Sequence, residues 1–206
     1  MSEIMDKAKN KKKINKNLTE IVAILDRSGS MTGLEQDIIG GYNNFIEKQK
    51  KEKSEANLTT ILFDDKYEIL HDRINLKDIE LITEKEYYAR GMTALLDAIG
   101  KTIQNFDEKI SNLKGKNKPG KVIFVITTDG YENASVEFTN KQIKEIVEKQ
   151  RKEKKWEFLF FGANIDSFDV GRQMGINHTY DYEASKEGID LKDNMVHDLV
   201  LEFRKE

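Results

Sequence analysis

Oxygen-bearing side chains in three separate segments of this chain could together bind a small divalent cation. Those side chains belong to Asp26, Ser28, Ser30, Thr93 and Asp129. The first three stand in an Asp-x-Ser-x-Ser spacing directly after an apolar run, and Asp129 follows a second apolar run and two threonines. Mg²⁺ prefers oxygen ligands in octahedral geometry, and Mn²⁺ and Ca²⁺ also accept them. The sequence therefore predicts a site for Mg²⁺, or for Mn²⁺ or Ca²⁺.

The charges of these ligands limit what such an ion could do. The serine and threonine hydroxyls are neutral, so at most the carboxylates of Asp26 and Asp129 would face a doubly charged cation. An ion held in this way retains affinity for one more anionic oxygen. We therefore expect that oxygen to come from another molecule.

Apolar runs and helical spacings alternate along the chain. Continuous apolar runs are typical of strands covered on both faces, and apolar residues spaced by three and four are typical of amphipathic helices. The predicted strands cover residues 21–25, 58–63, 67–70, 122–126, 158–161 and 179–182. The predicted helices contain residues 34–46, 93–113, 143–147 and 191–203. This alternation predicts an α/β fold with a doubly wound, mostly parallel sheet and helices on both faces.

One pair of predicted strands has too short a connection to be parallel. Only residues 64–66 separate the strand at 58–63 from the strand at 67–70, so this pair must be antiparallel. Farther along the chain, Pro119-Gly120 predicts the turn that precedes the next buried strand.

The predicted topology would bring the five oxygen-bearing residues to one edge of the sheet. Ligands of doubly wound sheets bind outside the carboxyl ends of the strands, where the winding direction reverses. Asp26 ends the first predicted strand and Asp129 follows the fourth. If those strands are neighbours, their carboxylates converge, and Thr93 joins them because its loop leads into the helix before the fourth strand. Periodicity does not itself establish that neighbour relation.

Length and composition exclude several classes of protein. The chain has 206 residues, enough for one ordinary domain with a sizeable core. Its net charge of -3 argues against a nucleic-acid binder, and the absence of cysteine excludes disulfides and thiolate metal sites. There is no apolar run of the roughly 18 residues that a membrane span needs, and no apolar core of a signal peptide. We expect a cytoplasmic protein that binds neither nucleic acid nor membrane.

The start of the chain differs in composition from the rest. Residues 1–17 are rich in lysine and poor in apolar side chains, which predicts a flexible, solvated basic arm. A basic arm that contacts an acidic partner is the alternative. No internal repeat or linker divides the remainder, so residues 18–206 are expected to form a single domain.

The motif formed by Asp26, Ser28 and Ser30 with Thr93 and Asp129 resembles the metal-ion-dependent adhesion site of von Willebrand factor A (VWA) domains. The chain is similar to the small stand-alone members found in bacteria and their phages, over most of its length. The resemblance implies a Rossmann-like sheet with one antiparallel edge strand. It also implies that Ser28, Ser30 and either Thr93 or Asp129 bind the ion directly, while Asp26 and the remaining residue often act through water.

The same resemblance implies a function. Members of this family are usually binding modules without catalytic activity, and a Glu or Asp of a protein partner commonly completes the metal coordination. We therefore expect a divalent-metal-dependent protein-binding module and not an enzyme. Neither the identity of the partner nor the oligomeric state follows from the sequence.

The same residues also admit purely structural interpretations. Ser30, Thr32 or Thr93 could cap the helices that follow them, because serine and threonine are common N-cap residues. Asp129-Gly130 could be an ordinary turn at a strand end. Glu132 could tune a metal site, but a solvated loop residue is the simpler interpretation.

A catalytic alternative is a Mg²⁺-dependent phosphohydrolase resembling the haloacid dehalogenase family. Such enzymes carry Asp-x-Asp after the first strand, where one carboxylate is the nucleophile and the other the general acid. Ser28 stands in place of the second aspartate and cannot supply a proton near neutral pH. The three histidines have no metal-ligand spacing. The binding module is therefore favoured over the enzyme.

Overall fold

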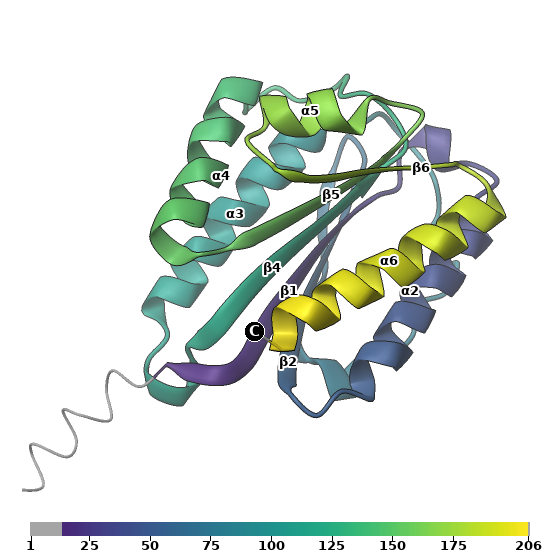
Figure 1. The fold of residues 1–206 in the computed structure, drawn as a ribbon. Coiled ribbons are helices and arrows are strands. Elements are labelled where there is room, and N and C mark those ends of the chain that lie inside the picture. Colours follow the sequence, from purple (N-terminus) through teal and green to yellow (C-terminus); the bar gives the residue numbers. More distant parts are fainter. Residues whose placement is uncertain (1–13, 206) are drawn as a thin grey trace, which may run out of the picture.

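The computed structural model of the protein describes residues 14–205, and its centre is a six-stranded sheet (Figure 1). The strands lie in the order β3-β2-β1-β4-β5-β6, and neighbours are parallel except β2 and β3. The strands are β1 (Asn15–Asp26), β2 (Glu55–Phe63), β3 (Tyr67–Asn75), β4 (Pro119–Thr128), β5 (Glu157–Ala163) and β6 (His178–Tyr182). The predicted mostly parallel sheet with one antiparallel edge strand is confirmed.

Helices cover both faces of the sheet (Figure 1). One face carries α2 (Glu35–Lys50) and α6 (Lys186–Lys205). The other face carries α3 (Leu95–Asn112), α4 (Asn140–Lys154) and α5 (Ser167–Gln173). Short 3-10 helices lie at Gly29–Met31, Leu76–Asp78 and Gly115–Asn117. The arrangement is the doubly wound architecture that the alternation of strands and helices predicts.

The central strand β1 explains why the sheet is covered twice. Ile21, Ala23 and Leu25 belong to the core beneath α2 and α6, whereas Val22 and Ile24 belong to the core beneath α3 and α4. Successive side chains of a strand point to opposite faces, so an uninterrupted apolar run needs a layer on each side. Each fully buried aliphatic side chain contributes about 1.5–3 kcal/mol relative to an exposed one. The apolar runs therefore occupy the middle of the sheet.

The first strand begins earlier than the sequence predicts. β1 starts at Asn15, whose N–H donates to the Lys118 carbonyl oxygen over 2.9 Å. The last three residues of the predicted arm, which covered residues 1–17, therefore belong to the sheet. Ile14, just before the strand, is exposed, and the rest of that prediction concerns residues 1–13, which lie outside the described residues.

The predicted turn at Pro119-Gly120 is also part of the sheet. Pro119 is the first residue of β4, a position at which the missing N–H of proline is tolerated. A Cβ atom on Gly120 would lie only 2.7 Å from the Lys16 Cα, so glycine permits the close approach of β4 to the start of β1. The glycine that suggested a turn instead marks a backbone contact.

Helix α5 is not predicted by the sequence pattern, because its seven residues are too short to show helical periodicity. Asp166 begins it by accepting a hydrogen bond from the Asp169 N–H (2.8 Å). A parallel connection must cross from one end of the sheet to the other, and α5 lies within the connection between β5 and β6. Its place therefore follows from topology rather than from residue spacing.

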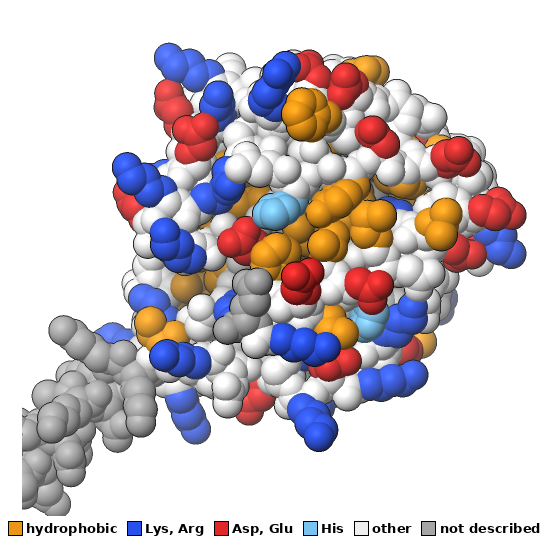
Figure 2. Space-filling view, in the orientation of Figure 1, with side chains coloured by type: hydrophobic (Ala, Val, Ile, Leu, Met, Phe, Trp, Pro, Cys, Tyr) orange, Lys and Arg blue, Asp and Glu red, His pale blue; other side chains and the backbone are white. Residues whose placement is uncertain are grey.

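The surface carries charges of both signs. Figure 2 shows lysine and arginine interspersed with aspartate and glutamate around a central apolar patch. The chain contains 34 basic and 37 acidic residues, which accounts for this mixture. Within residues 14–205, no helix is long and apolar enough to cross a membrane.

Candidate metal centre

The carboxyl ends of β1 and β4 meet where the winding direction of the sheet reverses. β1 lies between β2 and β4, and Leu25 of β1 pairs with Thr127 of β4. Asp26 is the last residue of β1, and Asp129 directly follows the last residue of β4. The neighbour relation that periodicity left open is thus established, and it brings the two carboxylates to one edge of the sheet.

Four of the five predicted ligands form one hydrogen-bonded cluster. The hydroxyls of Ser28 and Ser30 lie 3.1 Å apart, and the Ser30 hydroxyl donates to Asp129 Oδ1 over 2.5 Å. The Ser28 N–H donates to Asp26 Oδ1 over 2.7 Å. Ser30 is exposed while the other three are buried, so the cluster opens to solvent on the side of Ser30.

Thr93 is joined to this cluster through the backbone of its loop. The Gly29 N–H donates to the Gly91 carbonyl oxygen over 3.1 Å, which places the loop before α3 against the serine loop. The Thr93 N–H donates to Asn133 Oδ1 (2.9 Å), and the Thr93 carbonyl oxygen accepts from the Asn133 N–H (3.0 Å). Thr93 therefore lies between the serine loop and the loop after β4.

Asp26 has two further partners that the sequence analysis does not identify. The Thr128 hydroxyl donates to Asp26 Oδ2 over 2.5 Å, and the Tyr87 hydroxyl donates to the Asp26 carbonyl oxygen over 2.6 Å. Thr128 adjoins Asp129 in the sequence, so its position beside the site was a usable signal. Tyr87 lies in an irregular segment whose fold no periodicity predicts.

Burial is the main influence on both carboxylates of the cluster. It raises the pKa of Asp26 from 3.8 to about 6, against the hydrogen bonds from Thr128 and Ser28, and the charge of Asp129 adds to the rise. Burial also raises the pKa of Asp129, and the hydrogen bond from Ser30 opposes it. In the described part of the chain neither carboxylate has a lysine, arginine or histidine as ion-pair partner.

This donor set fits a hard divalent cation. Two buried carboxylates without a cationic neighbour carry unbalanced negative charge, which is costly unless an ion pairs with it. The remaining donors are hydroxyl oxygens, which Mg²⁺ and similar ions accept. Among the described residues, this site included, no group of three or more His, Cys, Asp or Glu side chains is arranged to hold a metal, because the cluster combines only two carboxylates with hydroxyl oxygens.

The helix-cap interpretation of these hydroxyls does not match the structure. Helix α2 has Leu34 at its N-cap and α3 has Ala94, and neither cap makes a side-chain hydrogen bond. The Thr32 hydroxyl donates to the Gly29 carbonyl oxygen (2.7 Å) within the serine loop instead. The hydroxyls at residues 28, 30 and 93 are thus not used as helix caps.

Glu132 is an anchor of the loop after β4, not a freely solvated side chain. Its carboxylate accepts hydrogen bonds from the N–H groups of Ala134 (2.8 Å) and Ser135 (2.6 Å), and from the Leu96 N–H in the first turn of α3 (3.0 Å). In return, Asp97 of α3 accepts from the N–H groups of Val136, Glu137 and Phe138. The loop that carries Asp129 and the start of α3 are therefore tied to each other.

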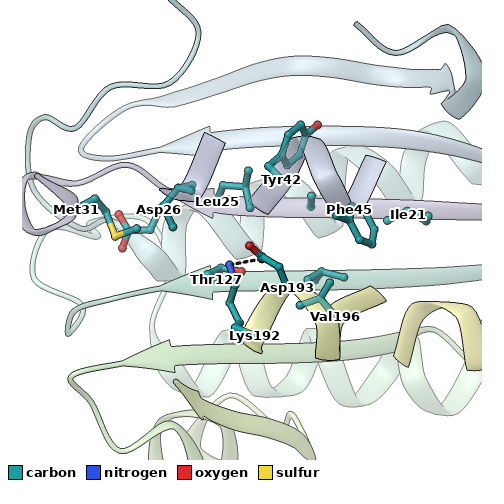
Figure 3. A pocket seen from close by; sticks show the side chains of 13 residues that line it. Ile21, Leu25, Asp26, Met31, Tyr42, Phe45, Thr127, Lys192, Asp193 and Val196 are labelled. Atoms are coloured by element: carbon teal, nitrogen blue, oxygen red, sulfur yellow. Dashed lines mark ion pairs between the residues drawn. The ribbon is translucent and has the colours of Figure 1, made fainter. Parts of the chain in front are cut away.

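A small cavity lies between the sheet and helices α2 and α6 (Figure 3). It is mostly apolar, with Asp26 at its margin, and the ion pair between Lys192 and Asp193 (2.7 Å) reaches it from α6. Its volume of about 40 Å³ is far below the roughly 300–1,000 Å³ of small-molecule sites. We regard it as a packing gap with room for a few water molecules.

Comparisons with known proteins identify the fold. No family model and no curated protein matches the sequence. The solved structure of manganese-loaded TRAP protein of Plasmodium vivax matches with a TM-score of 0.60 and 17% identity, covering 85% of this chain and 71% of that one. A von Willebrand factor type A structure from Catenulispora acidiphila matches with a TM-score of 0.60 and 11% identity, covering 88% of this chain and 42% of that one.

A third match is proximal thread matrix protein 1 of the mussel byssus, solved with a zinc-occupied MIDAS motif, where MIDAS denotes the metal-ion-dependent adhesion site. Its TM-score is 0.58 at 12% identity, covering 91% of this chain and 49% of that one. This chain thus spans less than half of the mussel and Catenulispora structures. Taken with the strand order, these matches show that the chain has the von Willebrand factor A fold.

Proposed function

We propose that this chain is a divalent-metal-dependent protein-binding module. Asp26, Ser28, Ser30, Thr93 and Asp129 would hold one cation, and a Glu or Asp of a partner would complete its coordination. The supporting observation is the pair of buried carboxylates linked by serine hydroxyls at the carboxyl ends of β1 and β4. No cationic side chain of the described residues balances them.

The chemistry of the donors favours Mg²⁺, with Mn²⁺ or Ca²⁺ as substitutes. Two of the matched structures are described as manganese-loaded and as having a zinc-occupied MIDAS motif, which supports a divalent ion at the same place in this fold. A bound cation supplies positive charge at the sheet edge. The hydroxyl ligands are neutral and Asp26 would act on the ion through water, so the directly bound ligands compensate only part of that charge, and an anionic oxygen from a partner binds more strongly there than water does.

We propose binding rather than catalysis at this site. In the phosphohydrolase alternative, the residue at position 28 would be the general acid. The Ser28 side chain is a hydroxyl group, hydrogen-bonded to the Ser30 hydroxyl, and it cannot donate a proton as an acid near neutral pH. An assay with a generic aryl phosphate, with and without Mg²⁺, tests this point. Metal-dependent turnover that is lost in Asp26→Ala would contradict the proposal.

Calorimetric titration with Mg²⁺ and Mn²⁺ tests the metal site directly. The wild type should bind one ion, and the Asp26→Ala and Ser28→Ala variants should lose that binding. Ser111→Ala is a suitable control, because Ser111 is an exposed serine at the far end of α3. Unchanged metal binding in both site variants would contradict the assignment of the metal site.

Cross-linking followed by binding assays tests the partner. Binding to an identified partner should weaken sharply in chelator, in Thr93→Ala, and when the contacting carboxylate of the partner is changed to an amide. Thr139→Ala, which removes only the cap of α4, should leave it intact. A partner that still binds under all three conditions must dock elsewhere on the molecule.

A further inference from the structure

Arg27 lies within the metal-binding motif, between Asp26 and Ser28, yet it is completely buried. A buried guanidinium needs charged partners, because leaving one unpaired is costly. Arg27 Nε donates to Asp64 Oδ2 over 3.0 Å, and Arg27 Nη2 donates to Glu68 Oε2 over 2.6 Å. Asp64 is itself fully buried, whereas the Glu68 side chain is 48% exposed. Asp64 is therefore the main buried counterion of the motif loop.

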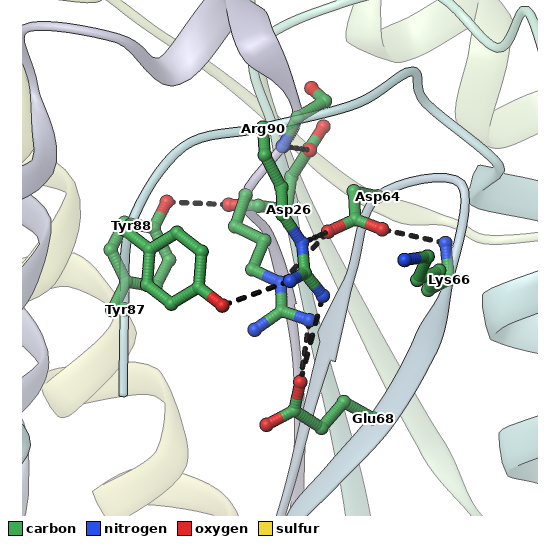
Figure 4. A network of polar contacts seen from close by, with 9 residues as sticks. Asp26, Asp64, Lys66, Glu68, Tyr87, Tyr88 and Arg90 are labelled. Atoms are coloured by element: carbon green, nitrogen blue, oxygen red, sulfur yellow. Dashed lines mark hydrogen bonds and ion pairs between the residues drawn. The ribbon is translucent and has the colours of Figure 1, made fainter. Parts of the chain in front are cut away.

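A second arginine reaches the same carboxylate oxygen from another loop (Figure 4). Arg90 precedes Thr93 by three residues, and its Nε donates to Asp64 Oδ2 over 2.6 Å. The Arg90 N–H also donates to the Arg27 carbonyl oxygen over 2.8 Å. One oxygen atom of Asp64 thus joins the serine loop to the loop that carries Thr93.

The remaining polar atoms of Asp64 fix its own position. Its Oδ1 accepts from the Lys66 N–H over 2.6 Å, within the turn between β2 and β3. Its carbonyl oxygen accepts from the N–H of Ala94 over 3.0 Å, and Ala94 directly follows Thr93. Asp64 therefore contacts the residue next to Thr93 as well as Arg27, the residue between Asp26 and Ser28.

We propose that Asp64 is a positioning residue of the metal centre: it sets the separation between the loop with Ser28 and Ser30 and the loop with Thr93. This inference rests on the proposed metal site and names a residue outside the motif on which that site depends. Polar groups that orient metal ligands typically change metal affinity by 10–100-fold when they are removed. Asp64→Asn keeps the size of the side chain but removes its negative charge, so the half-exposed Glu68 is the one carboxylate that still pairs with the two arginines among the described ion pairs.

The control is a second buried carboxylate paired with an arginine. Glu20 is fully buried, and its Oε1 accepts from Arg73 Nη2 over 2.6 Å. Glu20 and Asp26 are on the same strand six residues apart, which places Glu20 roughly 20 Å from the cluster. Glu20→Gln thus removes the same kind of charge at a distance from the metal ligands.

The experiment measures the Mn²⁺ dissociation constant by calorimetry for the wild type, Asp64→Asn and Glu20→Gln. Amide hydrogen exchange in chelator is measured alongside. We expect the dissociation constant of Asp64→Asn to rise by about tenfold or more and that of Glu20→Gln to stay at the wild-type value. Exchange in Asp64→Asn should accelerate at residues 27–31 and 88–94. Arg90→Gln removes the Arg90 contacts with Asp64, Glu68 and Tyr88 but leaves the pair between Arg27 and Asp64 in place. It should give a smaller rise, so it serves if Asp64→Asn does not fold.

The outcomes separate this inference from the proposed function. If the wild type binds Mn²⁺ and neither Asp64→Asn nor Arg90→Gln weakens that binding, the positioning role is wrong although the metal site stands. An equal loss in Glu20→Gln would also overturn it, because that loss reflects general destabilisation. If the wild type binds no cation, the proposed function fails. The exchange data then decide whether Asp64 orders the two loops.

Discussion

Asp26 and Asp64 are both fully buried aspartates, but their surroundings are opposite. Asp26 accepts hydrogen bonds from Thr128 and Ser28 and has no cationic partner among residues 14–205. Asp64 accepts from Arg27 and Arg90. Neutralising a buried charge that has no counterion relieves a cost, whereas neutralising one partner of a buried ion pair leaves the other charge unpaired, so the same substitution should have opposite effects at the two positions.

We predict that Asp26→Asn makes the metal-free protein more stable at pH 8, by on the order of 1–3 kcal/mol. The amide carries no charge, and the Thr128 hydroxyl can accept a hydrogen bond from it while donating to the Gly130 carbonyl oxygen. Chemical denaturation in chelator measures this. Added Mg²⁺ should stabilise the wild type and not the variant. A metal-free Asp26→Asn protein that is clearly less stable than the wild type would contradict this account.

The motif residues could be read from the sequence because their spacing is local and each follows an apolar run. Asp26, Ser28 and Ser30 needed only the strand at 21–25 for their placement, and Asp129 only the strand at 122–126. Tyr87 and Asp64 could not be assigned to the site in this way. They reach it through tertiary contacts 61 and 37 residues apart in the sequence, with Asp26 and Arg27 respectively.

At the scale of elements, the loops at the carboxyl end of the sheet are hydrogen-bonded to one another. Gly91 lies where two of these loops meet: its carbonyl oxygen accepts a hydrogen bond from the Gly29 N–H, and its φ is 68°. A Cβ atom there would lie 2.0 Å from Asp65 Oδ1 and 3.3 Å from Asp64 Cβ. Glycine avoids the backbone strain, whereas any other side chain would have to displace the exposed Asp65 carboxylate and would press on Asp64.

We predict that Gly91→Ala destabilises the fold by about 1–3 kcal/mol and also weakens divalent-cation binding. Gly175→Ala is the matched control, since Gly175 has a similar φ of 73° but lies after α5, outside the loops of the metal centre. It should show the backbone strain together with tight local contacts to Lys144 and Glu148, both far from the metal centre, and its metal affinity should be unchanged. Equal metal binding in the two variants would mean that the contact between the loops does not shape the site.

The ion pairs of Asp64 predict a pH dependence of stability. Burial alone would raise the pKa of Asp64, but the hydrogen bonds from Arg90 and the Lys66 N–H, together with the charges of Arg27 and Arg90, lower it. A carboxylate with a lowered pKa contributes stability above its unfolded pKa of about 4, and that contribution is lost as the pH falls through the folded pKa. In chelator, the stability difference between wild type and Asp64→Asn should therefore be constant near pH 7 and shrink below about pH 4. Urea denaturation at several pH values measures it, and a difference that grows on acidification would refute the assignment.

Residue patterns predicted the existence of the strands better than their ends. β3 extends to Asn75, five residues past the predicted end. The prediction missed this part because most of residues 71–75 are at least partly exposed and form no apolar run. β1 likewise begins at Asn15, in a polar segment that pairs with β4. Strand ends depend on hydrogen bonding to a neighbour, which periodicity does not contain.

At the scale of the whole molecule, the core does not depend on the metal centre. Two apolar clusters fill the two faces of the sheet, and the oxygen ligands lie at its edge. The energy of folding therefore comes chiefly from burial of aliphatic and aromatic side chains.

We predict that the protein melts cooperatively in chelator. Adding Mg²⁺ at a hundredfold excess over its dissociation constant should stabilise it by about 2.7 kcal/mol, as expected for a ligand that binds only the folded state. Scanning calorimetry with and without Mg²⁺ measures both quantities. A metal-free protein without a cooperative transition would show that the ion is needed for folding.

Glu132 and Asp97 each accept hydrogen bonds from backbone N–H groups of the segment that carries the other, and this reciprocity has a consequence for the evolution of the chain. Glu132 accepts from the start of α3, and Asp97 of α3 accepts from the loop that contains Glu132. Loss of either acid leaves N–H groups of the other segment without their acceptor, so we expect selection to act on the two positions jointly. Homologues should retain both acids or replace both, and the number of residues between β4 and α4 should vary little among those that retain them.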